Sequence, residues 1–110
     1  MFLPTFWLIS LGFAMTALGD DPPAKALDFH RDVRPVLADK CFRCHGPDEK
    51  ARRGQLRLDQ RESAIAMREG TAAIVPGRPD QSELMKRIEA SDGDLRMPPP
   101  DSKLELSAHE

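Results

Sequence analysis

The feature that most constrains this chain is the run Cys-Phe-Arg-Cys-His at residues 41–45, which holds both of its cysteines. Three chemistries use two cysteines at this spacing: a redox dithiol, half of a zinc site, and covalent attachment of haem. In the third, the two thiols add across the haem vinyl groups, and the adjacent imidazole reaches the iron from the same face. The chain around the run would then have to wrap a flat group of fixed size.

The alternatives to haem are weaker but stay open at this point. A closed zinc site needs four Cys or His ligands, and only three histidines accompany the two cysteines. A thioredoxin-like dithiol belongs in a βαβ unit, which the sequence does not indicate. A structural disulfide between Cys41 and Cys44 would suit an exported protein. The motif favours haem over a dithiol, a zinc module or a plain disulfide.

The first 19 residues are typical of a secretory signal peptide. They carry no charged residue, and an apolar run from Phe2 to Ala17 leads into the small residue Gly19, after which cleavage is expected. No Lys or Arg precedes the run, so an uncleaved membrane anchor is the alternative, although the run is shorter than the ~20 residues that a bilayer span needs. We expect residues 20–27 to form a linker, and the remainder to be exported.

Composition excludes some functions for the exported part. Its 18 acidic and 16 basic residues give a net charge of -2, so a general attraction to nucleic acid is not expected. Trp7 lies in the signal segment and Tyr is absent, which leaves Phe29 and Phe42 and no base-stacking surface. The carboxylates are scattered through charged segments, so no enzymatic activity is expected of this part. A small domain with so few large apolar side chains commonly relies on a non-protein group to complete its core.

Hydrophobic periodicity predicts about three short helices. The first covers residues 28–41, with Asp28 as N-cap and apolar residues at positions 29, 33, 36 and 37. Pro35 predicts either a kink or a helix start near Asp32, and Cys41 falls at the C-terminal end. The second covers residues 61–69 and is stopped by Gly70. The third covers residues 80–90.

Between these helices the sequence predicts irregular chain. The third helix should place Leu84, Met85 and Ile88 on one face, with Asp80 or Ser82 near its start. Residues 46–60 read as a loop, residues 75–81 as a turn, and residues 91–103 as a loop because three successive prolines forbid helix and central strand. The fold class expected is all-α, with helices and loops around one bound group.

Covalent haem leaves the sixth iron position to be filled, and Met97 is the best candidate. It lies in the run Arg-Met-Pro-Pro-Pro, where prolines stiffen the loop and reduce the entropy lost when a thioether is fixed. Met67 and Met85 fall in helical apolar patterns, which favours core packing for both. His30 is expected at the surface beside Phe29, and His109 lies close to the last residue given.

A basic cluster follows the cysteine motif. It comprises Lys50, Arg52, Arg53 and Arg57. Arginine makes bidentate contacts with carboxylates, so Arg52 and Arg53 are candidates to pair with haem propionates. A solvated loop is the alternative interpretation.

The segments "DFHRDVRPVLADKCFRCHGPDEKARRGQLRLD", "IVPGRPDQSELMKRI" and "RMPPP" together resemble the planctomycete-type cytochrome c domain, over residues 28–106. The resemblance implies one haem c on Cys41 and Cys44, His45 as proximal ligand, Met97 as distal ligand, and electron transfer by Fe(III)/Fe(II) cycling. Such domains lie near the N-terminus of large exported bacterial proteins. A redox partner protein or downstream domains of the same polypeptide are therefore the expected partners.

Members of this family continue past the "LELSAHE" stretch into a C-terminal helix that packs on the first helix, whereas the sequence here stops at Glu110. We therefore expect residues 28–110 to form a cytochrome c-like domain without that helix, in the periplasm or cell envelope. Membrane contact is expected solely through residues 1–19, if they are retained. A haem module with a structural or sensory role is the alternative function.

Overall fold

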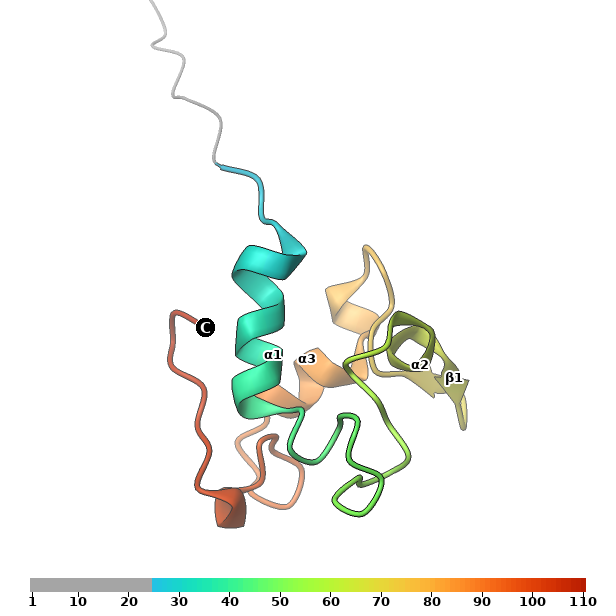
Figure 1. Ribbon diagram of the computed structural model, residues 1–110, viewed down its shortest axis with the longest axis vertical. Coiled ribbons are helices and arrows are strands. Elements are labelled where there is room, and N and C mark those ends of the chain that lie inside the picture. Colours follow the sequence, from blue (N-terminus) through green and yellow to red (C-terminus); the bar gives the residue numbers. More distant parts are fainter. Residues whose placement is uncertain (1–24) are drawn as a thin grey trace, which may run out of the picture.

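The computed structural model describes residues 25–110 of the chain. The predicted signal peptide and all but the last three residues of the predicted linker lie outside the described residues. Within residues 25–110, three α-helices are joined by a strand pair and shorter helical turns (Figure 1). In chain order the elements are η1 (Phe29–Val33), α1 (Arg34–Lys40), α2 (Arg61–Ile65), β1 (Met67–Arg68), β2 (Thr71–Ala72), η2 (Pro79–Gln81), α3 (Glu83–Ile88) and η3 (Pro100–Ser102).

The three predicted helices are present, but the antiparallel strand pair means that the all-α prediction is not confirmed. None of the helices in residues 25–110 is long and apolar enough to cross a bilayer.

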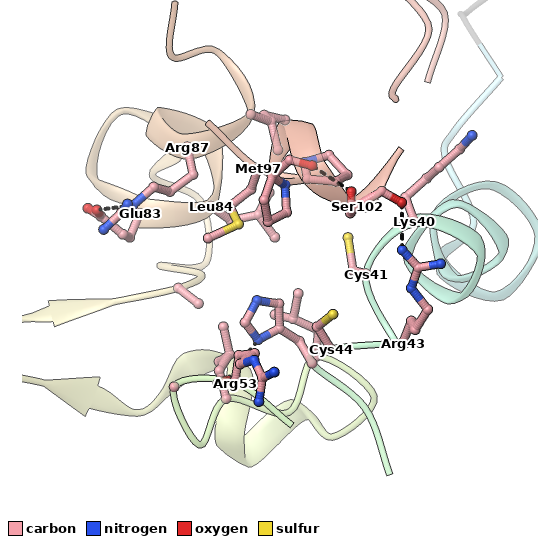
Figure 2. A pocket seen from close by; sticks show the side chains of 18 of the residues that line it. Lys40, Cys41, Arg43, Cys44, Arg53, Glu83, Leu84, Arg87, Met97 and Ser102 are labelled. Carbon is pink, nitrogen blue, oxygen red and sulfur yellow. Dashed lines mark hydrogen bonds and ion pairs between the residues drawn. The ribbon is translucent and has the colours of Figure 1, made fainter. Parts of the chain in front are cut away.

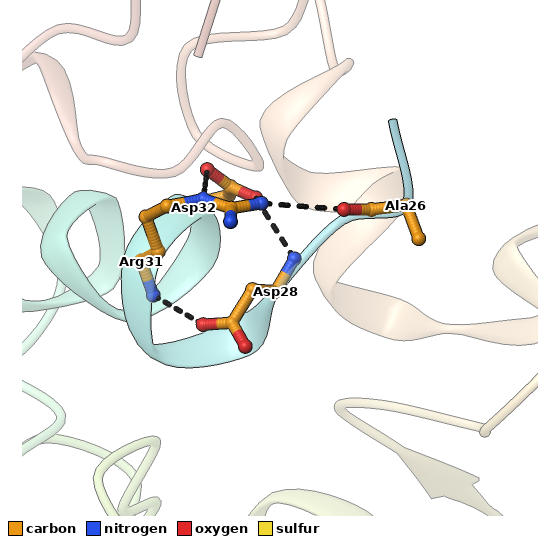
Figure 3. A network of polar contacts seen from close by, with 4 residues as sticks. All are labelled: Ala26, Asp28, Arg31 and Asp32. Carbon is orange, nitrogen blue, oxygen red and sulfur yellow. Dashed lines mark hydrogen bonds and ion pairs between the residues drawn. The ribbon is translucent and has the colours of Figure 1, made fainter. Parts of the chain in front are cut away.

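The first helical segment begins at Phe29, and Asp28 is its N-cap, as the sequence predicted. The Asp28 carboxylate accepts a hydrogen bond from the Arg31 backbone N–H at 2.8 Å, and the Asp28 N–H donates to Asp32 Oδ2 at 2.8 Å (Figure 3). Arg31 pairs with Asp32 and also donates to the carbonyl of Ala26. The hydrogen bond from Arg31, and after it the Asp28 N–H, lowers the pKa of Asp32. The start of the helix is thus held by reciprocal capping.

Pro35 explains why this segment has two parts. Residues Phe29–Val33 form a wide π-type turn, and the regular helix α1 starts at Arg34 with the proline in its first turn. Proline is tolerated there because its missing N–H has no intrahelical partner at that position. Of the predicted apolar stripe, Leu37 is buried and Val33 packs against the core, whereas Phe29 is half exposed.

The second helix is shorter than predicted. It ends at Ile65, because the chain becomes extended at Ala66 and then forms a hairpin of β1 and β2. Glu69 and Gly70, the two residues between the strands, both have positive φ (51° and 83°), which suits a tight two-residue hairpin turn. Gly70 therefore shapes a hairpin rather than stopping a helix.

The third helix, α3, also starts later than predicted. Ser82 directly precedes it, but its hydroxyl does not cap the helix. Instead the buried Ser82 Oγ accepts a hydrogen bond from the Val75 N–H at 2.9 Å and donates to the Arg78 carbonyl at 3.0 Å. The serine thereby ties the start of α3 to the predicted turn, which contains Gly77 at positive φ and the short helix η2.

The protein core is small. Its buried cluster comprises Leu37 from α1, Leu58 from the long loop and Ala64 from α2. Among residues 25–110 no side chain is fully buried. Around this cluster pack the partly buried residues Val33, Cys41, Phe42, Leu56, Ala73, Ile74 and Leu84. A core of this size buries little apolar surface, in agreement with the expectation that another group completes it.

Candidate haem-binding site

A cavity of about 710 Å³ lies between the cysteine motif, the following loop, α3 and the loop after it. Its volume is within the roughly 300–1,000 Å³ typical of ligand pockets. Cys41, Cys44, His45 and Met97 all line it. Figure 2 shows Cys44 and Arg53 on one wall and Met97 on the facing wall. The structure thus brings together the four residues that the sequence predicted as thioether anchors and iron ligands.

The cysteine motif follows α1 directly and forms a helix-like turn. The Cys41 N–H donates to the Leu37 carbonyl at 2.8 Å, and the His45 N–H donates to the Cys41 carbonyl at 2.8 Å. Residues three and four apart on such a turn face the same side. Cys41, Cys44 and His45 therefore project toward one cavity.

Gly46 closes this turn and is buried. A Cβ atom at this position would lie against the carbonyl oxygen of Phe42, far inside van der Waals contact. The motif turn can pack this closely onto its own preceding residues because position 46 has no side chain.

The imidazole of His45 is oriented by the loop that follows it. Its Nδ1 lies 3.1 Å from the Arg53 carbonyl oxygen, which can only accept, so Nδ1 carries the hydrogen. Nε2 then keeps its lone pair, the usual arrangement for a histidine that ligates a metal. Burial lowers the pKa of His45, against the opposing effect of hydrogen bonds to the Arg53 and Leu56 carbonyls. Burial thus favours the neutral imidazole that ligation requires, and the hydrogen bond to Arg53 selects the tautomer.

The long loop is anchored onto the motif by backbone hydrogen bonds. The Arg53 N–H donates to the Cys44 carbonyl at 2.8 Å, and the Leu58 N–H donates to the His45 carbonyl at 2.8 Å. Leu56 and Leu58 line the cavity between these points. The loop predicted for residues 46–60 is therefore irregular but fixed in place.

Both cysteines are free thiols in the structure, and both are partly buried. Burial raises the pKa of the Cys41 thiol. Reactive dithiols of the thioredoxin type have lowered pKa values, so this environment does not favour that alternative. In residues 25–110 no group of three or more Cys, His, Asp or Glu side chains converges as a zinc site would require.

A backbone hydrogen bond holds Met97 at the facing wall. Its N–H donates to the carbonyl of Arg87, in the last turn of α3, at 3.0 Å. Of its predicted rivals, Met67 is 67% exposed on β1, so the prediction that it packs in the core is wrong. Met85 is partly buried, and neither methionine lines the cavity.

The two predicted rival histidines also lie away from the cavity. His30 is exposed and packs edge-on against Phe29, with ring centroids 5.4 Å apart. His109 is exposed in the C-terminal segment. Neither histidine lines the cavity.

The two neighbouring arginines predicted as propionate contacts differ in position. Arg52 donates from Nε to the Gly46 carbonyl at 3.1 Å and from Nη2 to the Pro47 carbonyl at 3.2 Å, and it does not line the cavity. Arg53 does line the cavity. Within residues 25–110 its guanidinium forms no hydrogen bond or ion pair. Of the two arginines, Arg53 alone is thus at the cavity wall, and the contact with a propionate stays a prediction.

Several charged residues of the cavity wall were not singled out from the sequence. They are Lys40, Arg43, Arg68, Glu83, Arg87 and Asp101. A sequence signal existed for one pair, because Glu83 and Arg87 stand four apart on a helix, a spacing that favours an ion pair. The others lie at the end of α1, in the cysteine motif, on β1 and in η3, and their approach to the cavity is set by tertiary structure.

The family model described as Planctomycete cytochrome C matches residues 41–101, more than half of the chain. The chain belongs to the planctomycete cytochrome c family. This confirms the resemblance drawn from the sequence motifs. No curated protein and no solved structure matches the chain significantly.

Membership of the planctomycete cytochrome c family indicates a haem-binding, cytochrome-like domain, and the residues present fit that group. The cavity wall supplies a thiol pair and an imidazole whose Nε2 is available, with a thioether on the facing wall. Leucine and alanine side chains of the small core also line it, so its interior is largely apolar. These are the donor types and the environment that c-type haem uses in proteins.

Proposed function

We propose that this domain binds one haem c covalently and transfers single electrons. Cys41 and Cys44 would carry the thioether links, with His45 as the proximal ligand and Met97 as the distal ligand. The observation that supports this most directly is the convergence of these four residues on one cavity, although Met97 lies far along the chain. Haem c, when bound, supplies one-electron cycling between Fe(III) and Fe(II).

The chain's own residues would set the properties of the site. The Arg53 carbonyl holds the Nδ1 hydrogen of His45, which orients the ring and raises its basicity as a ligand. A methionine opposite a histidine raises the reduction potential relative to two histidines. Leu56, Leu58 and Leu84 would exclude water from the cavity.

Arg53 would act as counter-charge to a haem propionate. It lies at the cavity wall with an exposed guanidinium, and arginine binds carboxylates through two parallel hydrogen bonds. The neighbouring Arg52 would serve a different purpose, because it fastens the turn after the cysteine motif through the Gly46 and Pro47 carbonyls.

We further propose that the domain works outside the cytoplasm, in the periplasm or cell envelope. Its electrons would pass to a redox partner protein or to other domains of the same polypeptide. The domain itself would have no enzymatic activity.

The distal ligand distinguishes electron transfer from a sensory role. In the ferric protein, Met97→Ala should abolish the charge-transfer band between methionine sulfur and iron, and Met85→Ala should leave it unchanged. Carbon monoxide should bind the reduced wild-type protein poorly and the Met97→Ala variant readily. An unchanged band in Met97→Ala, or ready binding of carbon monoxide by the wild type, would contradict a fixed methionine ligand and favour sensing.

A further inference from the structure

Arg87, in the last turn of α3, makes two contacts with the loop that carries Met97. Its backbone carbonyl accepts a hydrogen bond from the Met97 N–H at 3.0 Å. Its side chain Nη1 donates to the Leu95 carbonyl at 3.4 Å. One residue thus holds the chain on both sides of position 96, immediately before the thioether.

The side chain of Arg87 is itself fixed by Glu83, one turn earlier on α3. Arg87 Nε donates to Glu83 Oε1 at 3.0 Å, and Figure 2 shows this pair next to Met97 at the cavity wall. Glu83, Arg87 and Met97 all line the cavity. The ion pair therefore lies beside the space that the haem would occupy.

The helix that carries this pair is in turn anchored to the core. Leu84 packs against the core cluster, and its N–H donates to the Ala73 carbonyl at 2.9 Å. The contacts made by Arg87 thus connect the loop of residues 91–99, through α3, to the core cluster. Without them that loop would depend on its internal turn, in which the Leu95 and Arg96 N–H groups donate to the Asp92 carbonyl.

We propose that Arg87 is a positioning residue for the distal thioether, with Glu83 orienting its guanidinium. This inference rests on the proposed role of Met97 as distal ligand. When the side-chain contact to Leu95 is lost, the loop should open more often and the methionine should be displaced more easily. Arg87 acts through the loop and touches neither the sulfur nor the iron in this account.

Arg87→Gln tests the proposal, with Lys86→Gln as a matched control. Lys86 also pairs with Glu83, at 3.9 Å, but its side chain is 56% exposed and does not line the cavity. In the ferric haem-loaded protein, Arg87→Gln should need about tenfold less cyanide to displace methionine, read from the charge-transfer band. Lys86→Gln should need the wild-type amount. Arg87→Lys should fall between them, because an ammonium cannot reproduce the two-sided donation of a guanidinium.

Hydrogen exchange gives a second readout that does not depend on the iron. Backbone amides of residues 94–97 should exchange about tenfold faster in Arg87→Gln than in Lys86→Gln. Should Arg87→Gln not accumulate, Glu83→Gln releases the guanidinium while keeping Arg87, and should lower the cyanide requirement about threefold relative to Lys86→Gln.

Two results would overturn the proposal in distinguishable ways. Equal cyanide requirement and equal exchange in Arg87→Gln and Lys86→Gln, with a band that Met97→Ala removes, would reject Arg87 and leave the proposed function intact. A band that Met97→Ala does not remove would reject the distal role of Met97, and the positioning role of Arg87 with it.

Discussion

The guanidinium of Arg43 donates a hydrogen bond of 2.8 Å to the backbone carbonyl of Ser102 (Figure 2). Arg43 lies between the two cysteines, and Ser102 lies in η3, just beyond the three prolines that follow Met97. Both residues line the cavity. The contact therefore connects the wall that carries the cysteines to the wall that carries the methionine, across a large separation in sequence.

Arg43→Gln should loosen this connection. A hydrogen bond from a charged donor at an exposed position contributes about 1 kcal/mol, so the free energy of unfolding should fall by about that amount in urea titrations. Lys50→Gln is the control, because Lys50 is an exposed cation of the next loop whose side chain forms no hydrogen bond within residues 25–110. Equal stabilities for the two variants would show that the Arg43 contact contributes nothing.

Gly46→Ala should be strongly destabilising. The added methyl group would collide with the Phe42 carbonyl, which is backbone and cannot move without opening the cysteine turn. Overpacking of this kind typically costs about 1–3 kcal/mol. Gly93→Ala is the matched control, since its Cβ would meet Pro100 Cγ at 3.7 Å, an ordinary contact. Thermal unfolding of both variants checks the difference, and a Gly46→Ala protein as stable as Gly93→Ala would refute the close packing described for this turn.

Arg53→Gln should lower the reduction potential. Removal of a positive charge from the cavity wall makes the oxidised, more positive iron less unfavourable. Arg52→Gln removes the same charge one residue earlier in the chain, but the Arg52 guanidinium is held by loop carbonyls away from the cavity. The main effect of Arg52→Gln should therefore be on the stability of the fold. Spectroscopic redox titrations of the two variants provide the comparison, and a larger potential change in Arg52→Gln would reverse the assignment of the two arginines.

Asp59 should give a pH-dependent contribution to stability. Arg57 binds it through two hydrogen bonds of 3.1 and 2.6 Å, and these lower the pKa of the Asp59 carboxyl, against an opposing effect of burial. A carboxyl whose pKa is lower in the folded state stabilises the fold above its unfolded pKa. That contribution is lost as the pH falls through the folded pKa.

Asp59→Asn should therefore lower the free energy of unfolding at neutral pH, and the difference from the wild type should become smaller as the pH falls. Asp80→Asn is the matched control: Arg78 and Asp80 have the same spacing, but their side chains are 56% and 65% exposed, against 26% and 13% for Arg57 and Asp59. Urea unfolding from pH 7 down to pH 3 measures both. An Asp59→Asn effect that is constant with pH would show that the charge is not involved.

Much of the site could be predicted from sequence because its chemistry is local or compositional. The cysteine motif fixes three groups within five residues, and Asp28 and Pro35 act on the first helix through backbone chemistry alone. Met97 was predicted because it lies in a proline-stiffened loop, whereas Met67 and Met85 fall in helical apolar patterns. The structure places it at the cavity as expected.

The hairpin at residues 67–72 was missed because its sequence continues a helical pattern. A tertiary contact ends α2. The Ile74 N–H donates to the Ala64 carbonyl at 2.9 Å, so the chain must turn back soon after Ile65. The positive φ that Glu69 and Gly70 adopt gives the turn its shape. A Gly preceded by a polar residue was the available signal for such a turn.

The difference between Arg52 and Arg53 could not be predicted either. In an irregular loop no periodicity assigns neighbouring side chains to a face, so both arginines fitted the propionate role equally well. Their placement depends on which backbone carbonyls lie nearby, namely those of Gly46 and Pro47 for Arg52. Likewise the sequence placed Asp80 or Ser82 near the start of the third helix, but it could not show that the Ser82 hydroxyl donates to the Arg78 carbonyl.

The central claim, covalent haem on Cys41 and Cys44, is tested most directly by the mass of the denatured protein. The full chain should be produced in a bacterium with the cytochrome c maturation machinery, alongside the double variant Cys41→Ala, Cys44→Ala. We predict that the wild-type polypeptide retains the mass of one haem after denaturation, with a haemochrome spectrum in which both vinyl groups are consumed, and that the double variant retains none. An intact, soluble wild-type polypeptide without haem, or haem retained by the double variant, would contradict the claim.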